Sequence, residues 1–399
     1  MSEFEYEGGF YGVALRKYLY RYEHLAFQTS LALLFDILGL LSGWLAATYL
    51  LGLKYPWLLI LYPGILGVRG AISGIFSGRL GTSLHLGLVK PGLRKNTYYF
   101  NLLVASTFTL PLIGGLLSGF MTLSVVFLFY RASFIEVLIL PLISTTVIFL
   151  STLILVPLAS QVAFTAFRYG LDPDVVLYPI MSTIADLGAT AIYIVVVEIY
   201  FRYSLIPLLS FFAACLAISV ISYLKFGKER EFAESLRESI YAMLFLLFFE
   251  NVAGSALHSI SGKIEKFASL MALYPVLIDS LGDIGSITGS RLTTLLAVGH
   301  AKNWRELLKA CGGDLLIVSA TAMLFYSLLG FTASSINTSL LLILIGCAIA
   351  VALIIPISIF TAVVTHRYKL NPDNFVNPIV SSMADGLMTL SLLLAAFLF

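Results

Sequence analysis

Long apolar runs are the feature that most constrains this chain. From residue 25 to the last residue, hydrophobic stretches of about twenty residues or more recur between short polar or turn-rich breaks. A helix of about twenty apolar residues crosses the roughly 30 Å hydrocarbon core of a bilayer. Charged residues make up 12% of the chain, about half the share in soluble domains. The sequence therefore excludes a soluble domain and predicts an all-α polytopic membrane protein whose surroundings are the lipid bilayer.

Eleven membrane spans are expected. The first run is too long for the hydrophobic region of a signal peptide, so we expect it to stay in the membrane behind a cytoplasmic segment at 1–24. The spans lie at 25–52, 56–88, 98–129, 133–167, 175–201, 203–224, 238–258, 267–299, 311–331, 338–366 and 375–398.

Basic residues predict the orientation, because Lys and Arg are retained on the cytoplasmic side. With the N-terminus inside, the inner segments hold sixteen Lys and Arg and the outer loops five, and Arg69, Arg79 and Arg291 at membrane depth complete the total of 24. We therefore expect the N-terminus inside and the C-terminus outside, in the cell membrane.

Several classes of function find no support in the sequence. The net charge of +2 gives no reason to expect a nucleic-acid partner. We find no phosphate-binding loop, nucleotide fingerprint or serine-nucleophile elbow, and the five histidines and three cysteines lack zinc-site spacing. We expect no enzyme activity and no resident cofactor.

An internal repeat organises the chain. Residues 62–87 and 274–299 share ten identical residues at a constant offset of 212, and residues 171–190 and 370–389 share nine more at an offset of 199. Each copy covers five spans. Because five is an odd number of spans, a second copy joined directly to the first would have the opposite orientation in the membrane. The uncharged run 203–224 adds one more crossing, which gives both copies the same orientation. In the alternative interpretation, 203–224 is only an additional packing helix.

The predicted organisation is two parallel five-helix repeats. We name residues 25–202 the first half and residues 235–399 the second half, with a linker helix and cytoplasmic connector at 203–234 between them. Such a chain is expected as a monomer with an internal pseudo-dimer or as a homodimer.

Ionisable residues at membrane depth are costly and therefore candidates for function. They are Asp36, Asp186, Glu250, Asp279, Asp283, Asp385, Arg69, Arg79 and Arg291.

The strongest candidates are Asp186 and Asp385, which occupy equivalent positions about 20 Å into the membrane from a capped helix start. One face of each helix presents a hydroxyl, the aspartate and a second hydroxyl: Ser182, Asp186 and Thr190 in the first half, and Ser381, Asp385 and Thr389 in the second.

If the halves pack about a two-fold axis, Asp186 and Asp385 face one cavity, where a divalent cation would relieve their repulsion. In the alternative interpretation, each aspartate only bonds a neighbouring helix.

A second acidic feature occurs in one half only. Asp279 and Asp283 follow Pro275 on one helix, and the aligned positions in the first half hold Gly67 and Ala71. The prolines and the small residues after them predict kinked or broken helices at Pro63 and Pro275.

These residues resemble the membrane domain of the MgtE family of magnesium transporters, in particular its two-domain eukaryotic solute-carrier branch. The resemblance rests on 275–299 (PVLIDSLGDIGSITGSRLTTLLAVG), 172–186 (DPDVVLYPIMSTIAD) and 371–385 (NPDNFVNPIVSSMAD). In that family the aspartate of the fifth helix lines the ion pathway, which implies this role for Asp186 and Asp385. No counterpart of the cytoplasmic gating domains of bacterial MgtE is found in this sequence.

The leading hypothesis is transport of a divalent cation, Mg²⁺ above all, between the two halves. Its predicted metal-facing residues are Asp186, Asp385, Ser182, Ser381, Asp283 and Asp279. Two alternatives stay open. Residues 280–283 (SLGD) resemble the Gly-x-Gly-Asp motif of intramembrane aspartyl proteases, and a carrier of another cation or small organic solute would also use buried acids. The sequence leaves open whether transport is channel-like or driven by exchange.

Overall fold

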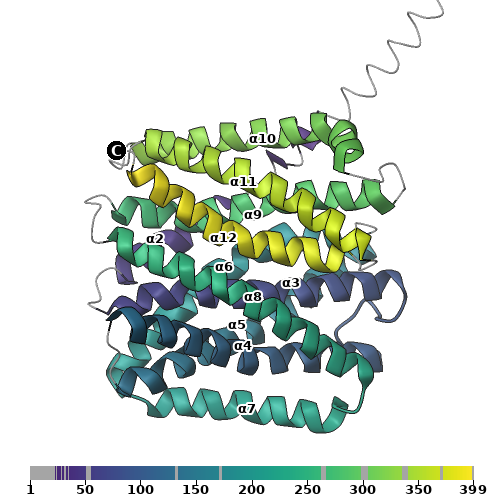
Figure 1. The fold of residues 1–399 in the computed structure, drawn as a ribbon. Coiled ribbons are helices and arrows are strands. Elements are labelled where there is room, and N and C mark those ends of the chain that lie inside the picture. The colour runs from purple at the N-terminus through teal and green to yellow at the C-terminus, as the bar shows by residue number, and fades with distance from the viewer. Residues whose placement is uncertain are drawn as a thin grey trace, which may run out of the picture.

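A computed structural model describes residues 36–50, 55–130, 134–169, 173–261, 267–297, 304–334, 340–368 and 372–397, together with a few positions between 23 and 34. Within these ranges the chain is helical and contains no strand (Figure 1). The helices are α2 (Gly39–Leu50), α3 (Pro56–His85), α4 (Tyr98–Tyr130), α5 (Phe134–Arg168), α6 (Pro173–Tyr203), α7 (Ile206–Phe226), α8 (Arg230–Ser261), α9 (Phe267–Ala297), α10 (Trp304–Ser334), α11 (Leu340–Arg367) and α12 (Pro372–Phe397).

The all-α prediction is confirmed, and each expected span from residue 56 onward coincides with one of these helices. α2 covers the second part of the first expected span, 25–52. Seven helices in the described part of the chain are long and apolar enough to cross a membrane: α3, α4, α5, α6, α7, α10 and α11. The total of eleven spans stays a prediction.

The helices continue through their internal prolines. Pro63 lies inside α3 and Pro275 inside α9, so neither helix is broken at its proline. A kink at either proline stays a prediction.

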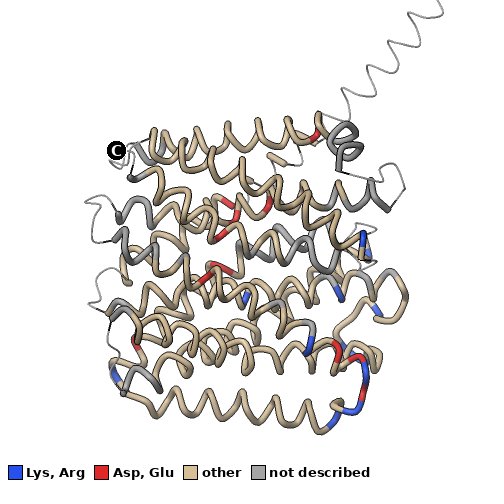
Figure 2. Tube along the Cα trace, viewed as in Figure 1, with Lys and Arg blue, Asp and Glu red and all other residues tan. Residues whose placement is uncertain are grey.

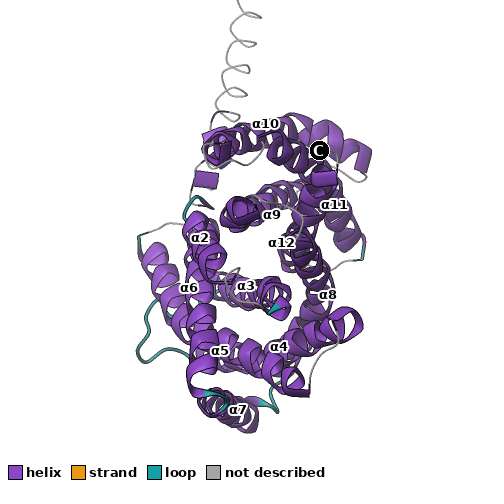
Figure 3. Ribbon diagram, turned by 90° about the vertical axis from the view of Figure 1, so that its left-hand side faces the viewer, coloured by secondary structure: helices purple, strands orange, loops and turns teal. Residues whose placement is uncertain are grey.

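The first helix of each half packs on the other half. α2 precedes α3 in sequence but packs extensively on α9, while α8 precedes α9 and packs extensively on α3 (Figure 3). α6 also contacts α9, and α12 contacts α3. The contacts between the halves are thus reciprocal, and α3 and α9 lie at the centre of the bundle.

α7 lies at the edge of the bundle against α4, α5 and α6. Much of its surface is apolar and open, including Ile206, Ile221 and Leu224. Such a face suits contact with lipid hydrocarbon rather than water.

Candidate cation site

Several acidic residues lie at mid-length of the helices, whereas most described Lys and Arg lie toward one end of the bundle (Figure 2). Asp36, Asp186, Glu250 and Asp283 are buried, and Asp279 and Asp385 are half-buried. An ionised carboxylate away from water needs a compensating charge or donor. What compensates each of them therefore determines what this region can bind.

Asp186 is compensated by the protein itself. Its Oδ1 forms an ion pair with Nη2 of Arg69, and the two side chains are 4% and 3% exposed. The pair joins α6 to α3 and neutralises the carboxylate in the interior.

Asp385 instead meets another acid. Its carboxyl group lies within hydrogen-bonding reach of Glu250, which is fully buried on α8. Neither oxygen of Glu250 accepts a hydrogen bond from a protein donor. Gly67 on α3 makes room for this group, because a Cβ at that position would collide with Glu250 Oε1. Two carboxyl groups this close repel each other when both are ionised, and a shared proton or a bound cation relieves that repulsion.

Three further acids lie beside α9. Asp36, three residues before α2, is close enough to Asp279 and Asp283 for their charges to interact. Oδ2 of Asp36 and Oδ2 of Asp279 are buried without a hydrogen-bond partner. The charge of Arg69 also acts on Asp279 and on Asp385. Arg69 is therefore the basic side chain that connects the acids of the two halves.

The same hydrogen-bond chain holds each aspartate-bearing helix in place. In the first half Tyr62 Oη lies 3.0 Å from Thr190 Oγ1, which donates to the backbone carbonyl of Asp186 at 2.8 Å. In the second half the bond from Tyr274 to Thr389 is 2.7 Å long, and Thr389 donates to the carbonyl of Asp385 at 2.7 Å.

Each threonine hydroxyl uses its one proton on the carbonyl, so each tyrosine must be the donor to its threonine. The sequence placed these threonines on the same helix face as their aspartates. In the structure their hydroxyls also bond tyrosines of α3 and α9.

Sequence comparison identifies the family to which this helical bundle belongs. The MgtE family model, described as a divalent cation transporter, matches residues 62–196 and 274–395. The chain belongs to the MgtE family. Solute carrier family 41 member 3 from Mus musculus is 23% identical over 372 residues, covering 86% of this chain and 75% of the mouse protein. No solved structure matches the chain.

Membership in the MgtE family makes the chain an integral membrane protein that transports divalent cations. The family consists of transporters, not enzymes, so the protease alternative is wrong. Residues 280–283 lie inside α9 as part of its packed helical surface, with Ser280 bonding the hydroxyl of Tyr326 at 3.1 Å.

For this MgtE-family protein, the structure locates most of the predicted site residues. Asp279 and Asp283 lie on α9, close enough to Asp36 for their charges to interact, and Oγ of Ser381 lies 3.5 Å from where a Cβ on Gly282 would be. The side chain of Ser182 lies outside the described residues. Asp186 lies beside Arg69, and Asp385 lies beside Glu250. The positive charge of Arg69 acts on both aspartates.

Sequence reasoning counted Asp36, Glu250 and Arg69 among the ionisable residues at membrane depth but did not place them in the site. These residues come together because α2 packs on α9 and α8 packs on α3. The order of apolar runs in the sequence does not reveal which helices pack together.

The described side chains include no group of three or more His, Cys, Asp and Glu arranged to hold a metal ion. Mg²⁺ usually retains several waters and is bound through one or two carboxylates. A two-carboxyl arrangement such as Glu250 with Asp385 therefore fits a partly hydrated ion better than a closed cage of protein ligands.

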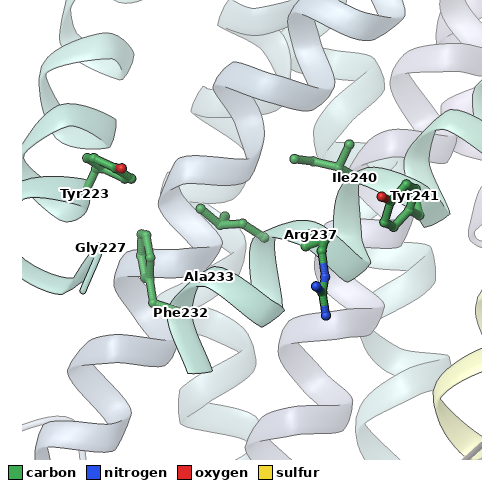
Figure 4. A pocket seen from close by; sticks show the side chains of 8 residues that line it. Tyr223, Gly227, Phe232, Ala233, Arg237, Ile240 and Tyr241 are labelled. Atoms are coloured by element: carbon green, nitrogen blue, oxygen red, sulfur yellow. The ribbon is translucent and has the colours of Figure 1, made fainter. Parts of the chain in front are cut away.

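One cleft in the described part of the chain lies away from these acids. It has a volume of about 370 Å³ and lies between α7 and α8, where Phe232, Leu236 and Ile240 line it together with Arg237 (Figure 4). Its one charged lining residue is a cation, which would repel a metal ion. A hollow of about 10 Å³, roughly room for one water, touches Arg69 between α3, α4 and α5.

Proposed function

We propose that this chain transports Mg²⁺ along a path between its two halves, with Asp186 and Asp385 at the path. The observation that carries the proposal is the buried pair of Glu250 and Asp385, where Glu250 receives no hydrogen bond from the protein. Such a pair in a divalent cation transporter is suited to bind the transported ion, because the ion supplies the missing positive charge.

The choice of Mg²⁺ rests on ligand chemistry. The candidate ligands are carboxylate and hydroxyl oxygens, which suit hard cations such as Mg²⁺ and Ca²⁺. Ca²⁺ favours six to eight oxygen ligands, whereas Mg²⁺ keeps its waters and needs few protein oxygens. Asp279, Asp283, Ser182 and Ser381 would act mainly through those waters.

The parallel two-repeat arrangement is part of the proposal. Supporting it are the two separate family matches, the reciprocal packing of α2 on α9 and α8 on α3, and the equivalent tyrosine–threonine bonds. In this arrangement α7 is the linker crossing that gives both halves the same orientation.

The proposed orientation in the cell membrane has the N-terminus inside and the C-terminus outside. Lys90, Arg94, Lys225, Lys228 and Arg230 fall on the side that this orientation assigns to the cytoplasm. We propose that the functional unit is a monomer with an internal pseudo-dimer or a homodimer.

A liposome assay tests the function. Full-length protein is reconstituted with a Mg²⁺-sensitive dye inside, and uptake is compared for wild type and a variant with both Asp186→Ala and Asp385→Ala. Glu198→Gln on α6 is the matched control, since Glu198 is an acid on an exposed part of the same helix as Asp186. We expect the double variant to lose at least about tenfold in rate and the control to match wild type.

Undiminished uptake by the double variant would contradict the proposed path. Equal uptake of Mn²⁺ or Ca²⁺ would contradict Mg²⁺ selectivity. Repeating the assay with and without a Na⁺ or proton gradient separates a channel-like path from an exchanger.

A further inference from the structure

The two halves carry opposite charge on corresponding segments of their central helices, although not at equivalent positions. In the alignment at offset 212, Arg69 of α3 corresponds to Leu281 of α9, and Asp279 and Asp283 of α9 correspond to Gly67 and Ala71 of α3. One central helix therefore presents a cation where the other presents two acids. A site shared equally by both halves is inconsistent with this distribution.

We propose that the Arg69 guanidinium is a built-in counter-ion for Asp186. It supplies to Asp186 the positive charge that the transported cation supplies to Asp385. The chain then binds one divalent cation, held by Asp385 and Glu250. This inference rests on the proposed function and specifies which half of the path binds the ion.

In the first half, the cation position beside Asp186 is already occupied by the guanidinium of Arg69. The Arg69–Asp186 ion pair is almost completely buried, and a guanidinium keeps its proton in proteins. The positive charge beside Asp186 is therefore permanent and does not exchange with solvent. Asp186 acts as a positioning residue that holds Arg69, and it does not contact the cation.

On the side of the second half, Asp385 lies beside a second carboxyl group and not beside a guanidinium. Glu250 is fully buried, and both of its oxygens lack a protein donor. Gly67 leaves room for its carboxyl group, which lies beside Asp385. The two carboxyls come from α8 and α12, two helices that pack on each other, so their separation is set by the fold.

Arg69 also limits how many cations can bind. Its charge acts on Asp279 and Asp385 as well as on Asp186. A second divalent cation near Asp186 would meet this positive charge in a medium that screens it poorly. One bound cation per chain is the expected result.

Calorimetric titration of the purified full-length protein with MgCl₂ tests the inference. We expect one Mg²⁺ per chain, and a loss of at least about tenfold in affinity for Glu250→Gln and for Asp385→Asn. The variant with both Arg69→Leu and Asp186→Asn removes the ion pair and leaves no unpaired charge. Because the positive charge of Arg69 near Asp385 is also gone, this variant should still bind Mg²⁺, at least as tightly as wild type. Asp186→Asn alone should weaken binding, because Arg69 then loses its partner.

Four results overturn the inference: two Mg²⁺ per chain, unchanged affinity in Glu250→Gln, loss of binding in the Arg69→Leu/Asp186→Asn variant, or unweakened binding in Asp186→Asn alone. The first two readouts do not depend on the fold of the double variant. A single elution peak and an unchanged melting temperature check that each variant is folded, and Glu198→Gln is the control for changing an acid to an amide. Wild-type protein that takes up no Mg²⁺ in liposomes contradicts the proposed function, whereas active protein that binds two ions contradicts this inference alone.

Discussion

Arg69 and Asp186 form an ion pair between α3 and α6 in which both side chains are less than 5% exposed. Removing one partner leaves the other charge buried without compensation, which costs about 3–5 kcal/mol, whereas replacing both by neutral side chains is often close to neutral. Comparing the free energies of unfolding of the single and double variants therefore distinguishes the contribution of the ion pair from that of other contacts of the two residues.

We expect Arg69→Leu alone to lower the free energy of unfolding by about 3 kcal/mol, and the further change Asp186→Asn to restore most of the loss. Thermal unfolding in detergent measures both. Arg230→Leu is the control, because Arg230 pairs with Glu234 at the surface at 2.7 Å and such exposed pairs contribute little. If the double variant is no more stable than Arg69→Leu alone, the contribution of Arg69 to stability does not come from its ion pair with Asp186.

The bond from Tyr62 to Thr190 has an equivalent between Tyr274 and Thr389, so the two tyrosines can be tested as a pair. Tyr62→Phe and Tyr274→Phe each remove one buried donor, and the threonine keeps its bond to the backbone carbonyl. We expect each change to cost about 0.5–1 kcal/mol in the free energy of unfolding. Tyr241→Phe, at an exposed position of α8, should have no effect. Unequal losses at Tyr62 and Tyr274 would contradict the equivalence of the halves.

The positions of the helices and of the buried charges follow from the sequence alone. Apolar runs and the polar breaks between them are local signals, and an acid within a long apolar run is identified as buried by its position. Both the helical bundle and the depth of Asp186, Asp385, Glu250 and Asp36 were predictable in this way.

The partners of these acids were not predictable. Glu250 meets Asp385 because α8 packs on α3 and α12. Helix pairing of this kind depends on small residues such as Gly67, whose role appears only when its neighbour is known. The sequence likewise placed Thr190 on the same face of α6 as Asp186 but did not reveal its bond to Tyr62, because periodicity gives the face of a residue but not its hydrogen-bond partner.

Gly67 allows a direct test of the space around Glu250. A methyl group at position 67 would collide with Glu250 Oε1, so Gly67→Ala must displace that carboxyl. We expect Mg²⁺ affinity to fall by about tenfold, equivalent to about 1.4 kcal/mol. Gly70→Ala is the matched control on the same helix, because nothing lies within 4 Å of the added carbon. Equal Mg²⁺ affinities in the two variants would indicate that the position of Glu250 does not matter for binding.

The crossing of α2 onto α9 depends on Gly43. A Cβ at this position would collide with the backbone carbonyl of Ala272 and lie 2.9 Å from Cδ of Pro275. Because a backbone atom moves only with its helix, Gly43→Ala should push α2 away from α9 and cost about 1–3 kcal/mol in the free energy of unfolding. Gly312→Ala on α10 has open space around the added carbon and should leave the melting temperature unchanged. If Gly43→Ala and Gly312→Ala have the same melting temperature, the close contact between α2 and α9 is absent in solution. The approach of Asp36 to Asp283 would then be absent as well.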